Sequence, residues 1–213
     1  MRTVVGALLN FRDAWEAMEP AMQKEPHFKP PKHVVLYLKP ANTWRADGDD
    51  IVLPAGVDEV EVGATLGVVI GASAARVSER DALQYVAGYA AVNDVTVPHS
   101  AILRPPIKQK CRDTFCPIGP VALAGGVPHP ETLEIRSYVN GELKATNSMR
   151  DLVRPVAKLI SEVTEFMTLE CGDVLLVGVP ANVPRARAGD RVVVEVDRVG
   201  RVGNAVRAEG DRL

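Results

Sequence analysis

Gly88-Tyr-Ala-Ala-Val-Asn-Asp-Val-Thr96 is followed, after a short gap, by Lys110-Cys-Arg-Asp-Thr-Phe-Cys-Pro-Ile-Gly-Pro120. The first segment is an apolar, helix-like run. Its polar end at Asn93-Asp94 predicts that the Asp94 carboxylate projects into a cleft as a ligand or a base. The second segment combines charged side chains with rigid Gly and Pro turns, and binding residues often lie on such loops. Together the two segments mark the candidate functional site.

The loop between and within these segments is rich in cations. On a backbone stiffened by Pro105-Pro106 it carries Arg104, Lys108, Lys110 and Arg112. A loop with this charge suits an anionic small molecule. The alternative is that the cations form a solvated loop and that Asp94 caps a turn. A run of charges alone does not distinguish the two interpretations.

Composition limits the classes of partner. The chain has 213 residues, 46% of them hydrophobic, so it can bury one sizeable core and is predicted to form one domain over residues 1–213. Its 25 basic and 27 acidic residues leave a net charge of −2. So small a charge gives no long-range field for nucleic acid or an anionic membrane, and we expect neither as a partner. No apolar run approaches the ~20 residues that a membrane span needs.

The cysteines indicate a reducing compartment. Cys111, Cys116 and Cys171 are odd in number and form no CxxC pair. The N-terminus also lacks a basic region followed by an apolar run and a cleavage site. A cytoplasmic location is therefore expected. Cys111 and Cys116 have no further Cys or nearby His to complete a metal site, which favours a packing role.

Most of the chain is predicted to form strands. Apolar or alternating runs indicate them at 1–9, 34–38, 59–70, 121–123, 133–139, 174–177 and 192–196, and Asn140-Gly141 predicts a hairpin before 142–145. Helices are expected at 13–22, at 78–86 behind a Ser78–Asp81 capping box and closed by Gly88, and from Pro155 within 148–168. Trp15, Met18 and Met22 are assigned to the core. Strands outnumber helices without regular alternation, which predicts a β-rich, mixed-sheet α+β fold.

These segments resemble the fumarylacetoacetate hydrolase family. Its members share Gly-Tyr-x-x-x-Asn-Asp-Val-Thr, Lys-x-x-Asp-Thr-Phe-x-Pro-x-Gly-Pro, Val-Asn-Gly-Glu and a late Gly-x-Pro turn, found here at 88–96, 110–120, 139–142 and 178–180. Residues 104–119 and the pattern around Gly63-Ala-Thr65 resemble one branch more closely. That branch is the N-terminal half or subunit of the bifunctional isomerase/decarboxylases of 4-hydroxyphenylacetate (homoprotocatechuate) degradation. The resemblance implies a β-roll of mixed sheets with a few peripheral helices, as in the family's C-terminal domain.

The resemblance also implies a metal. In the family Mg²⁺ or Mn²⁺ is held by a Glu-x-Glu pair and by the aspartate of Asn-Asp, here Asp94. Residues i and i+2 of a strand face the same way, so the pair can share one hard cation. Aligned on Leu66–Gly71, the two glutamates fall at Gly63 and Thr65, which carry no carboxylate. Metal binding by this chain is therefore expected to be weak or absent.

Other family positions also lack their functional groups. The His-x-x-Glu of many members falls at Ala14 and Ala17, neither of which can transfer a proton, and Val179 replaces a threonine in the late turn. Glu59 and Glu61 do form a Glu-x-Glu. They lie four residues upstream, roughly 13 Å along an extended strand, which favours an exposed strand edge.

The remaining candidates are mostly charged. The predicted catalytic residues are Lys110, Asp94 and Asp113, and the predicted substrate-binding residues are Arg104, Arg112, Asn10, Lys39 and Asn182. A lysine can stabilise an enolate, or act as an acid if desolvation lowers its pKa. The alternative for Lys110 is a structural salt bridge to Asp94 or Asp113, and for the polar cleft-lining candidates it is the capping of turns.

Three functions follow from the resemblance. The first is an enzyme subunit that decarboxylates 5-oxopent-3-ene-1,2,5-tricarboxylate and isomerises 2-hydroxyhepta-2,4-diene-1,7-dioate through a stabilised dienolate. The second is a non-catalytic structural partner of a metal-bearing sister subunit. The third is a metal-dependent hydrolase or oxaloacetate-type decarboxylase, which requires Glu59 and Glu61 to reach Asp94. A homo-oligomer, or a hetero-oligomer with a related subunit, is expected by analogy with the family.

Overall fold

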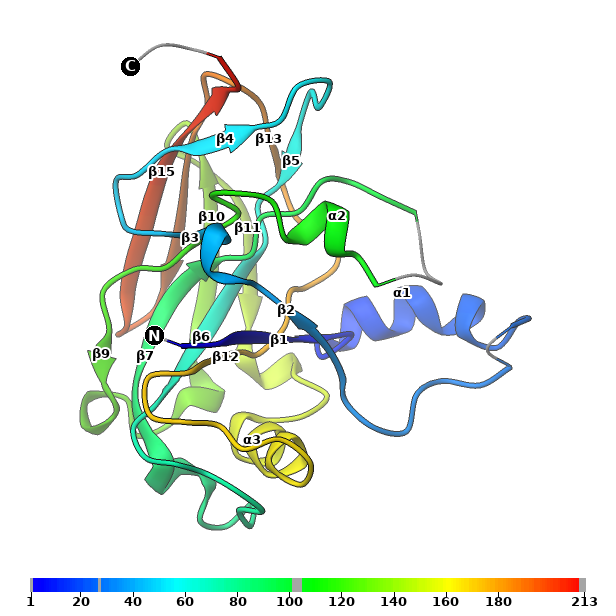
Figure 1. Ribbon diagram of the computed structural model, residues 1–213, viewed down its shortest axis with the longest axis vertical. Helices are drawn as coiled ribbons and strands as arrows, with labels where there is room; N and C mark the ends of the chain where they lie inside the picture. The colour runs from blue at the N-terminus through cyan, green and yellow to red at the C-terminus, as the bar shows by residue number, and fades with distance from the viewer. Residues whose placement is uncertain (1, 27, 101–104, 211–213) are drawn as a thin grey trace.

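Two β-sheets of mixed strand direction form the body of the molecule, and short helices lie at its margins (Figure 1). A computed structural model describes residues 2–26, 28–100 and 105–210. The larger sheet has the strand order β2-β1-β12-β6-β7-β9, and the smaller has the order β11-β10-β14-β15-β4. This arrangement confirms the predicted α+β fold of mixed sheets.

The larger sheet is built from β2 (Val35–Leu38), β1 (Val4–Leu8), β12 (Val174–Leu176), β6 (Ala64–Ile70), β7 (Val86–Asn93) and β9 (Ala122–Leu123). The smaller is built from β11 (Glu142–Ser148), β10 (Glu134–Val139), β14 (Arg191–Val196), β15 (Gly200–Ala208) and β4 (Ile51–Leu53). Two short pairs connect the loops: β13 (Arg185–Ala186) with β5 (Val60–Glu61), and β3 (Trp44–Arg45) with β8 (Cys116–Pro117). Parallel pairing occurs between β1 and β12, β15 and β4, and β3 and β8.

The helices are few and peripheral. They are α1 (Arg12–Met22), α2 (Ile107–Lys110) and α3 (Val156–Thr164), with 3₁₀ turns at Ala41–Thr43, Ala82–Tyr85, Ala124–Gly126, Pro130–Thr132 and Met149–Asp151. In Figure 1, α1 projects sideways from the sheets and α3 lies at the lower end. None of the helices described is long and apolar enough to cross a membrane.

Two predictions around residue 90 are wrong. The segment that ends at Asn93 is the strand β7 and not a helix, because it pairs with β6 on one side and β9 on the other. The expected helix at 78–86 is a 3₁₀ turn over Ala82–Tyr85, although the Ser78 hydroxyl does donate to the Asp81 carboxylate at 2.7 Å. Gly88 therefore lies inside β7, where an added Cβ would come within 2.3 Å of the Ala122 carbonyl oxygen.

The main core lies between the two sheets and is closed by α3. Leu66 of β6, Ile135 of β10 and Val194 of β14 are fully buried in it. On α3, Leu159, Ile160 and Val163 complete the apolar face that the 3- and 4-residue spacing predicts. Pro155 was expected at the first helical position. It is instead the N-cap, and α3 begins one residue later, at Val156.

Replacing Leu159 with alanine should destabilise the protein by about 2–5 kcal/mol, because the fully buried side chain leaves a cavity between helix and sheets. Urea unfolding followed by circular dichroism measures this. Lys158→Ala, one position earlier on the exposed side of α3, should change the free energy of unfolding by less than about 0.5 kcal/mol. Equal effects of the two substitutions would contradict the proposed packing of α3.

Candidate functional site

A buried carboxylate between two ammonium groups forms the centre of the site. Asp94 directly follows β7 and is 1% exposed. Lys39 Nζ lies 2.7 Å from Asp94 Oδ1, and Lys110 Nζ lies 2.7 Å from Asp94 Oδ2. The Tyr37 hydroxyl also donates to Oδ2, at 2.5 Å. The prediction that Asp94 projects into a cleft is therefore wrong, because both its oxygens face buried partners.

Lys39 is a structural residue, although it was predicted to bind substrate. It is fully buried, and its ammonium donates to the carbonyl oxygens of Val95, Lys110 and Phe115 at 2.7–2.8 Å. An ammonium has three hydrogens, so these carbonyls take all of them and Asp94 Oδ1 is paired with Lys39 by charge alone. Lys39 thereby fixes the chain segments after β7, at the end of α2 and before β8.

Lys110 is the member of the cluster that reaches the surface. Its ammonium donates to Asp94 Oδ2 and, at 2.8 Å, to Thr96 Oγ1, and it lies 4.5 Å from the centre of the Tyr37 ring. Its side chain is 8% exposed. The structure thus contains the salt bridge to Asp94 that was one alternative for Lys110, and it also places the lysine at a cleft.

Local sequence explains how Tyr37 and Lys39 reach the carboxylate. Residues two apart on an extended segment face the same side, so both side chains point from β2 and its end toward Asp94. Tyr37 pairs with Gly6 of β1, and a Cβ on Gly6 would come within 2.2 Å of the Tyr37 ring. Glycine at position 6 therefore makes room for the ring.

The protonation states follow from burial and charge. Burial raises the pKa of Asp94, but Lys110 and Lys39 outweigh it and lower the pKa to about 2. Burial lowers the pKa of Lys39, opposed by the charge of Asp94. Burial and the neighbouring Asp94 hold the pKa of Tyr37 well above its usual value. Asp94 is thus a carboxylate at neutral pH and is not a proton donor.

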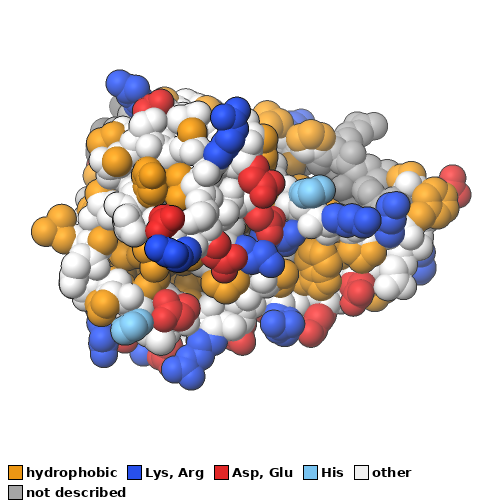
Figure 2. Space-filling model, turned by 90° about the horizontal axis from the view of Figure 1, so that it is seen from below, with side chains coloured by type: hydrophobic (Ala, Val, Ile, Leu, Met, Phe, Trp, Pro, Cys, Tyr) orange, Lys and Arg blue, Asp and Glu red, His pale blue; other side chains and the backbone are white. Residues whose placement is uncertain are grey.

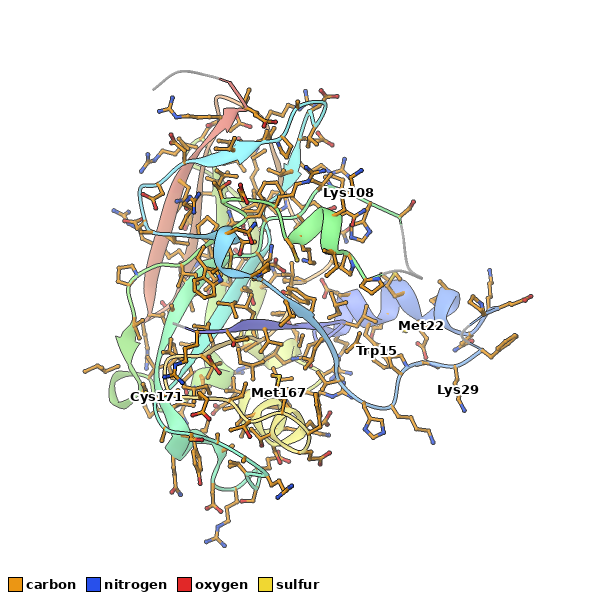
Figure 3. The ribbon with its side chains drawn as sticks, in the orientation of Figure 1. Trp15, Met22, Lys29, Lys108, Met167 and Cys171 are labelled. Carbon is orange, nitrogen blue, oxygen red and sulfur yellow. The ribbon has the colours of Figure 1, made fainter. Side chains whose placement is uncertain are left out.

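A cleft of about 890 Å³ opens beside Lys110, a volume within the range of ligand pockets. Its lining is mostly apolar, with Leu8 and Leu9 at the end of β1, Met18 and Met22 of α1, and Val35 of β2. Of the three residues assigned to the core, Met22 is buried, whereas Trp15 and Met18 are half-buried. Met18 and Met22 also form a wall of the cleft. His99, Pro106 and Lys110 also line it. A Pro-rich segment between α1 and β2, residues 28–33 and called the link below, contributes further lining residues. Figure 3 shows Met22 on α1 and Lys29 on this link.

Several predicted site residues lie elsewhere. Asn10 is buried. Its side-chain NH₂ donates to the carbonyl oxygens of Val177 and Arg154, and its side-chain oxygen accepts from the Arg154 backbone N–H. Arg112 and Asp113 line a different cavity beside Arg45 and Thr114. Asp113 is exposed and accepts from Asn42 at 2.7 Å. Asn182 is exposed, with a φ of 55° in a turn. Arg104 lies outside the described residues.

The carboxylates present do not fit the family's metal site. Gly63 lies against Asp94, where an added Cβ would come within 2.3 Å of the Asp94 carbonyl oxygen, and Thr65 contributes only a buried hydroxyl. Among the described residues no three His, Cys, Asp or Glu side chains cluster in a way that could hold a metal. Both Asp94 oxygens already face cations.

Glu59 and Glu61 do not complete that metal site either. Glu59 is paired with Arg185 and Arg187. Glu61 is half-buried, and its backbone bridges to Thr96 by hydrogen bonds of 2.8 and 3.3 Å. Burial raises the pKa of Glu61, against the lowering effect of Lys110, Arg185 and His99. The prediction of an exposed strand edge therefore does not describe Glu61, which lies in the electrostatic neighbourhood of the cleft.

Sequence reasoning missed Tyr37, Thr96 and His99. Tyr37 had an available signal, because it stands two residues before a lysine at the end of a predicted strand. Thr96 lies within the quoted segment, but its contact with Lys110 depends on the return of the chain through α2. No local pattern distinguishes His99 from other loop residues.

Comparisons with known proteins agree with the fold. A model of the fumarylacetoacetate (FAA) hydrolase C-terminal family matches residues 3–207. The 4-hydroxyphenylacetate degradation bifunctional isomerase/decarboxylase of Escherichia coli is 40% identical over 192 residues, which are 90% of this chain and 44% of that protein. The chain thus spans about half the length of the curated relatives it matches.

Solved structures share the fold over nearly the whole chain. A 2-hydroxyhepta-2,4-diene-1,7-dioate isomerase from Mycobacterium marinum has a TM-score of 0.78 at 27% identity, covering 98% of this chain and 75% of that one. A fumarylpyruvate hydrolase from Pseudomonas aeruginosa, in complex with Mn²⁺ and pyruvate, has a TM-score of 0.85 at 25% identity, covering 98% and 91%.

The lowered pKa of Asp94 makes stability depend on pH in a defined direction. A carboxyl group whose pKa falls from 3.8 to about 2 on folding stabilises the protein by about 2 kcal/mol above pH 4, and this is lost as the pH falls through 2. Asp94→Asn removes the charge and should destabilise the protein by about 3 kcal/mol at pH 6, since it leaves buried ammonium groups unpaired. The difference in unfolding free energy between wild type and Asp94→Asn should be about 1 kcal/mol smaller at pH 3 than at pH 6, because the wild type has by then lost part of the stabilisation from the charged carboxylate. Urea unfolding at the two pH values measures this difference.

Asp58→Asn is the control for this experiment. Asp58 is exposed, and its substitution should change the unfolding free energy by less than about 0.5 kcal/mol at either pH. If the difference between wild type and Asp94→Asn stayed constant from pH 6 to pH 3, Asp94 would not be the buried charge described above.

Proposed function

Because the chain belongs to the fumarylacetoacetate hydrolase family, we propose that it binds an open-chain 2-oxo or 2-hydroxy-dienoic di- or tricarboxylate and stabilises the dienolate that forms when a proton moves or carbon dioxide leaves. The substrates we assign are 2-hydroxyhepta-2,4-diene-1,7-dioate for isomerisation and 5-oxopent-3-ene-1,2,5-tricarboxylate for decarboxylation. The E. coli relative supports this assignment by its name, and the M. marinum structure supports the isomerisation.

One observation carries the proposal. Lys39 and Lys110 share the single carboxylate of Asp94, so the buried cluster has an excess of positive charge. The hydrogens of Lys39 are taken up by three carbonyl groups, whereas Lys110 lines the cleft. The unneutralised charge is therefore presented to the cleft by Lys110, where it attracts an anion.

The role of Lys110 is electrostatic in this mechanism. Its ammonium contacts the oxygen that becomes negatively charged in the dienolate, and hydrogen bonds to Asp94 and Thr96 hold it in place before the reaction begins. Such preorganised charge stabilises a transition state most in surroundings of low polarity, and most of the cleft lining is apolar. Asp94 orients Lys110 and remains ionised throughout.

Divalent metal is not part of the mechanism that we propose for this chain. In the family a metal ion would chelate the 2-oxo acid and stabilise the enolate. Gly63 and Thr65 stand where the family's glutamates would be, and among the described residues no three His, Cys, Asp or Glu side chains cluster in a way that could hold a metal. Lys110 supplies the positive charge instead.

The test is an assay of the purified chain with 2-hydroxyhepta-2,4-diene-1,7-dioate, followed by ultraviolet absorbance, in EDTA and in Mg²⁺. We expect the same turnover in both conditions. Lys110→Met should lower kcat/KM at least about 100-fold while circular dichroism stays unchanged, because an electrostatic contact to the reacting oxygen is lost.

Lys108→Met is the matched control. Lys108 is exposed on the same short helix and lies on the side away from α1 (Figure 3), so its loss should leave kcat/KM unchanged. Turnover that appears only with Mg²⁺ would overturn the metal-free mechanism, and absence of turnover in both conditions would remove the claim that this chain is catalytic by itself.

A non-catalytic role beside a metal-bearing sister subunit is the second candidate. The glycine and threonine at the family glutamate positions favour it. In that case, the complex of this chain with its sister should keep its activity when Lys110 is replaced by methionine. A large loss of activity with assembly intact would exclude the purely structural role.

A further inference from the structure

The wall of the cleft contributed by the link carries positive charge of its own. Lys29, Lys32 and His33 lie on this link, with Pro30 and Pro31 between the two lysines, and all five residues line the cleft. On the right of Figure 2, over α1 and this link, Lys or Arg side chains and a histidine lie beside apolar surface. The cleft therefore has cations on the link as well as at Lys110.

These cations lack counter-charges. Within 2–26, 28–100 and 105–210, no carboxylate lines the cleft, and neither Lys29 nor Lys32 has an ion pair or a side-chain hydrogen bond. Both side chains are exposed. The same cleft has an apolar lining that includes Leu8, Met18 and Met22. A ligand that carries two anionic groups on an apolar chain matches a cleft that combines cations with an apolar lining.

The link is fixed to the body of the protein where it presents these groups. The Arg154 guanidinium donates to the Lys32 carbonyl oxygen at 3.1 Å and pairs with Glu162 of α3 at 2.6 Å. The Arg154 backbone is held in turn by Asn10, through hydrogen bonds of 2.9 and 3.1 Å. Arg154 is 8% exposed, so the anchor is a buried one. Residue 32 therefore has a defined position relative to the cleft.

We propose that Lys29 and Lys32 form a subsite for the remote carboxylate of the substrate, whose 2-oxo or 2-hydroxy acid end is bound by Lys110. The inference rests on the function proposed above and adds to it the basis for selecting a diacid over a monoacid. The Pro30-Pro31 segment limits the backbone freedom of the link and so reduces the entropy lost when the lysines close on the carboxylate.

The experiment measures the binding of two matched acids by isothermal titration calorimetry at constant ionic strength. These are 2-oxoheptanedioate and 2-oxoheptanoate, which differ only in the remote carboxylate. We expect the wild-type chain to prefer the diacid by roughly tenfold, equivalent to about 1.4 kcal/mol. The variant with Lys29→Ala and Lys32→Ala should lose this preference and bind the monoacid as the wild type does.

Two further variants separate this inference from the proposed function. Lys110→Met should weaken both acids alike, whereas Lys24→Ala, which removes an exposed cation next to α1 that does not line the cleft, should weaken neither. An unchanged diacid preference in the double variant would overturn the subsite and leave the role of Lys110 intact. Failure of the wild type to bind either acid would overturn both. The monoacid affinity also reports that the double variant is folded.

Discussion

A carboxylate enclosed by cations holds this structure together at its functional end. Burying an ionised group is costly unless it is paired, and the pairing must also satisfy the hydrogen-bonding capacity of each partner. Asp94 meets the first condition with Lys39 and Lys110, and the carbonyl groups around Lys39 meet the second. Two cations against one anion leave a net positive charge. The fold directs this charge toward the cleft because Lys110 is among the lining residues, whereas Lys39 and Asp94 are not.

The sheets make that arrangement possible. β7 carries Asp94 at its end, β2 carries Tyr37 and ends next to Lys39, and α2 ends at Lys110. On one face of the larger sheet, Val92 and Leu176 pack with Cys116 of β8 in a second, smaller apolar cluster that includes the Tyr37 ring. The polar centre is thus surrounded by packed side chains, and the low polarity of that environment strengthens each interaction within it.

The fold was more predictable from the sequence than the site. Alternating and apolar runs located β1, β2, β10 and α3, because burial of one face imposes a period that a single sequence displays. β7 was misread as a helix, since a strand buried on both faces has no alternation. In the site, Lys110 and Asp94 were found from their motif. Lys39 was found but given the wrong role, because its burial and its carbonyl partners depend on contacts distant in sequence. Arg112 and Asp113 were assigned to the site because they are close to Lys110 in sequence. Their side chains nevertheless line a different cavity.

The three hydrogen bonds of Lys39 have a consequence for how such a protein can change over evolution. They join the chain after β7, the end of α2 and the segment before β8 into one unit. Moving any one of these segments away would leave one hydrogen of a buried ammonium without its acceptor. The opposite wall, formed by α1 and the link, is joined to the body of the protein through Arg154 and through Asp13, which accepts a hydrogen bond from the Ala181 backbone. Met22 of this wall is buried, whereas Lys29 and Lys32 are exposed. Substitutions of its exposed residues can accumulate without disturbing the charged cluster. Under the functions proposed above, ligand preference and the chemistry at Lys110 are therefore separable traits, carried by different parts of one chain.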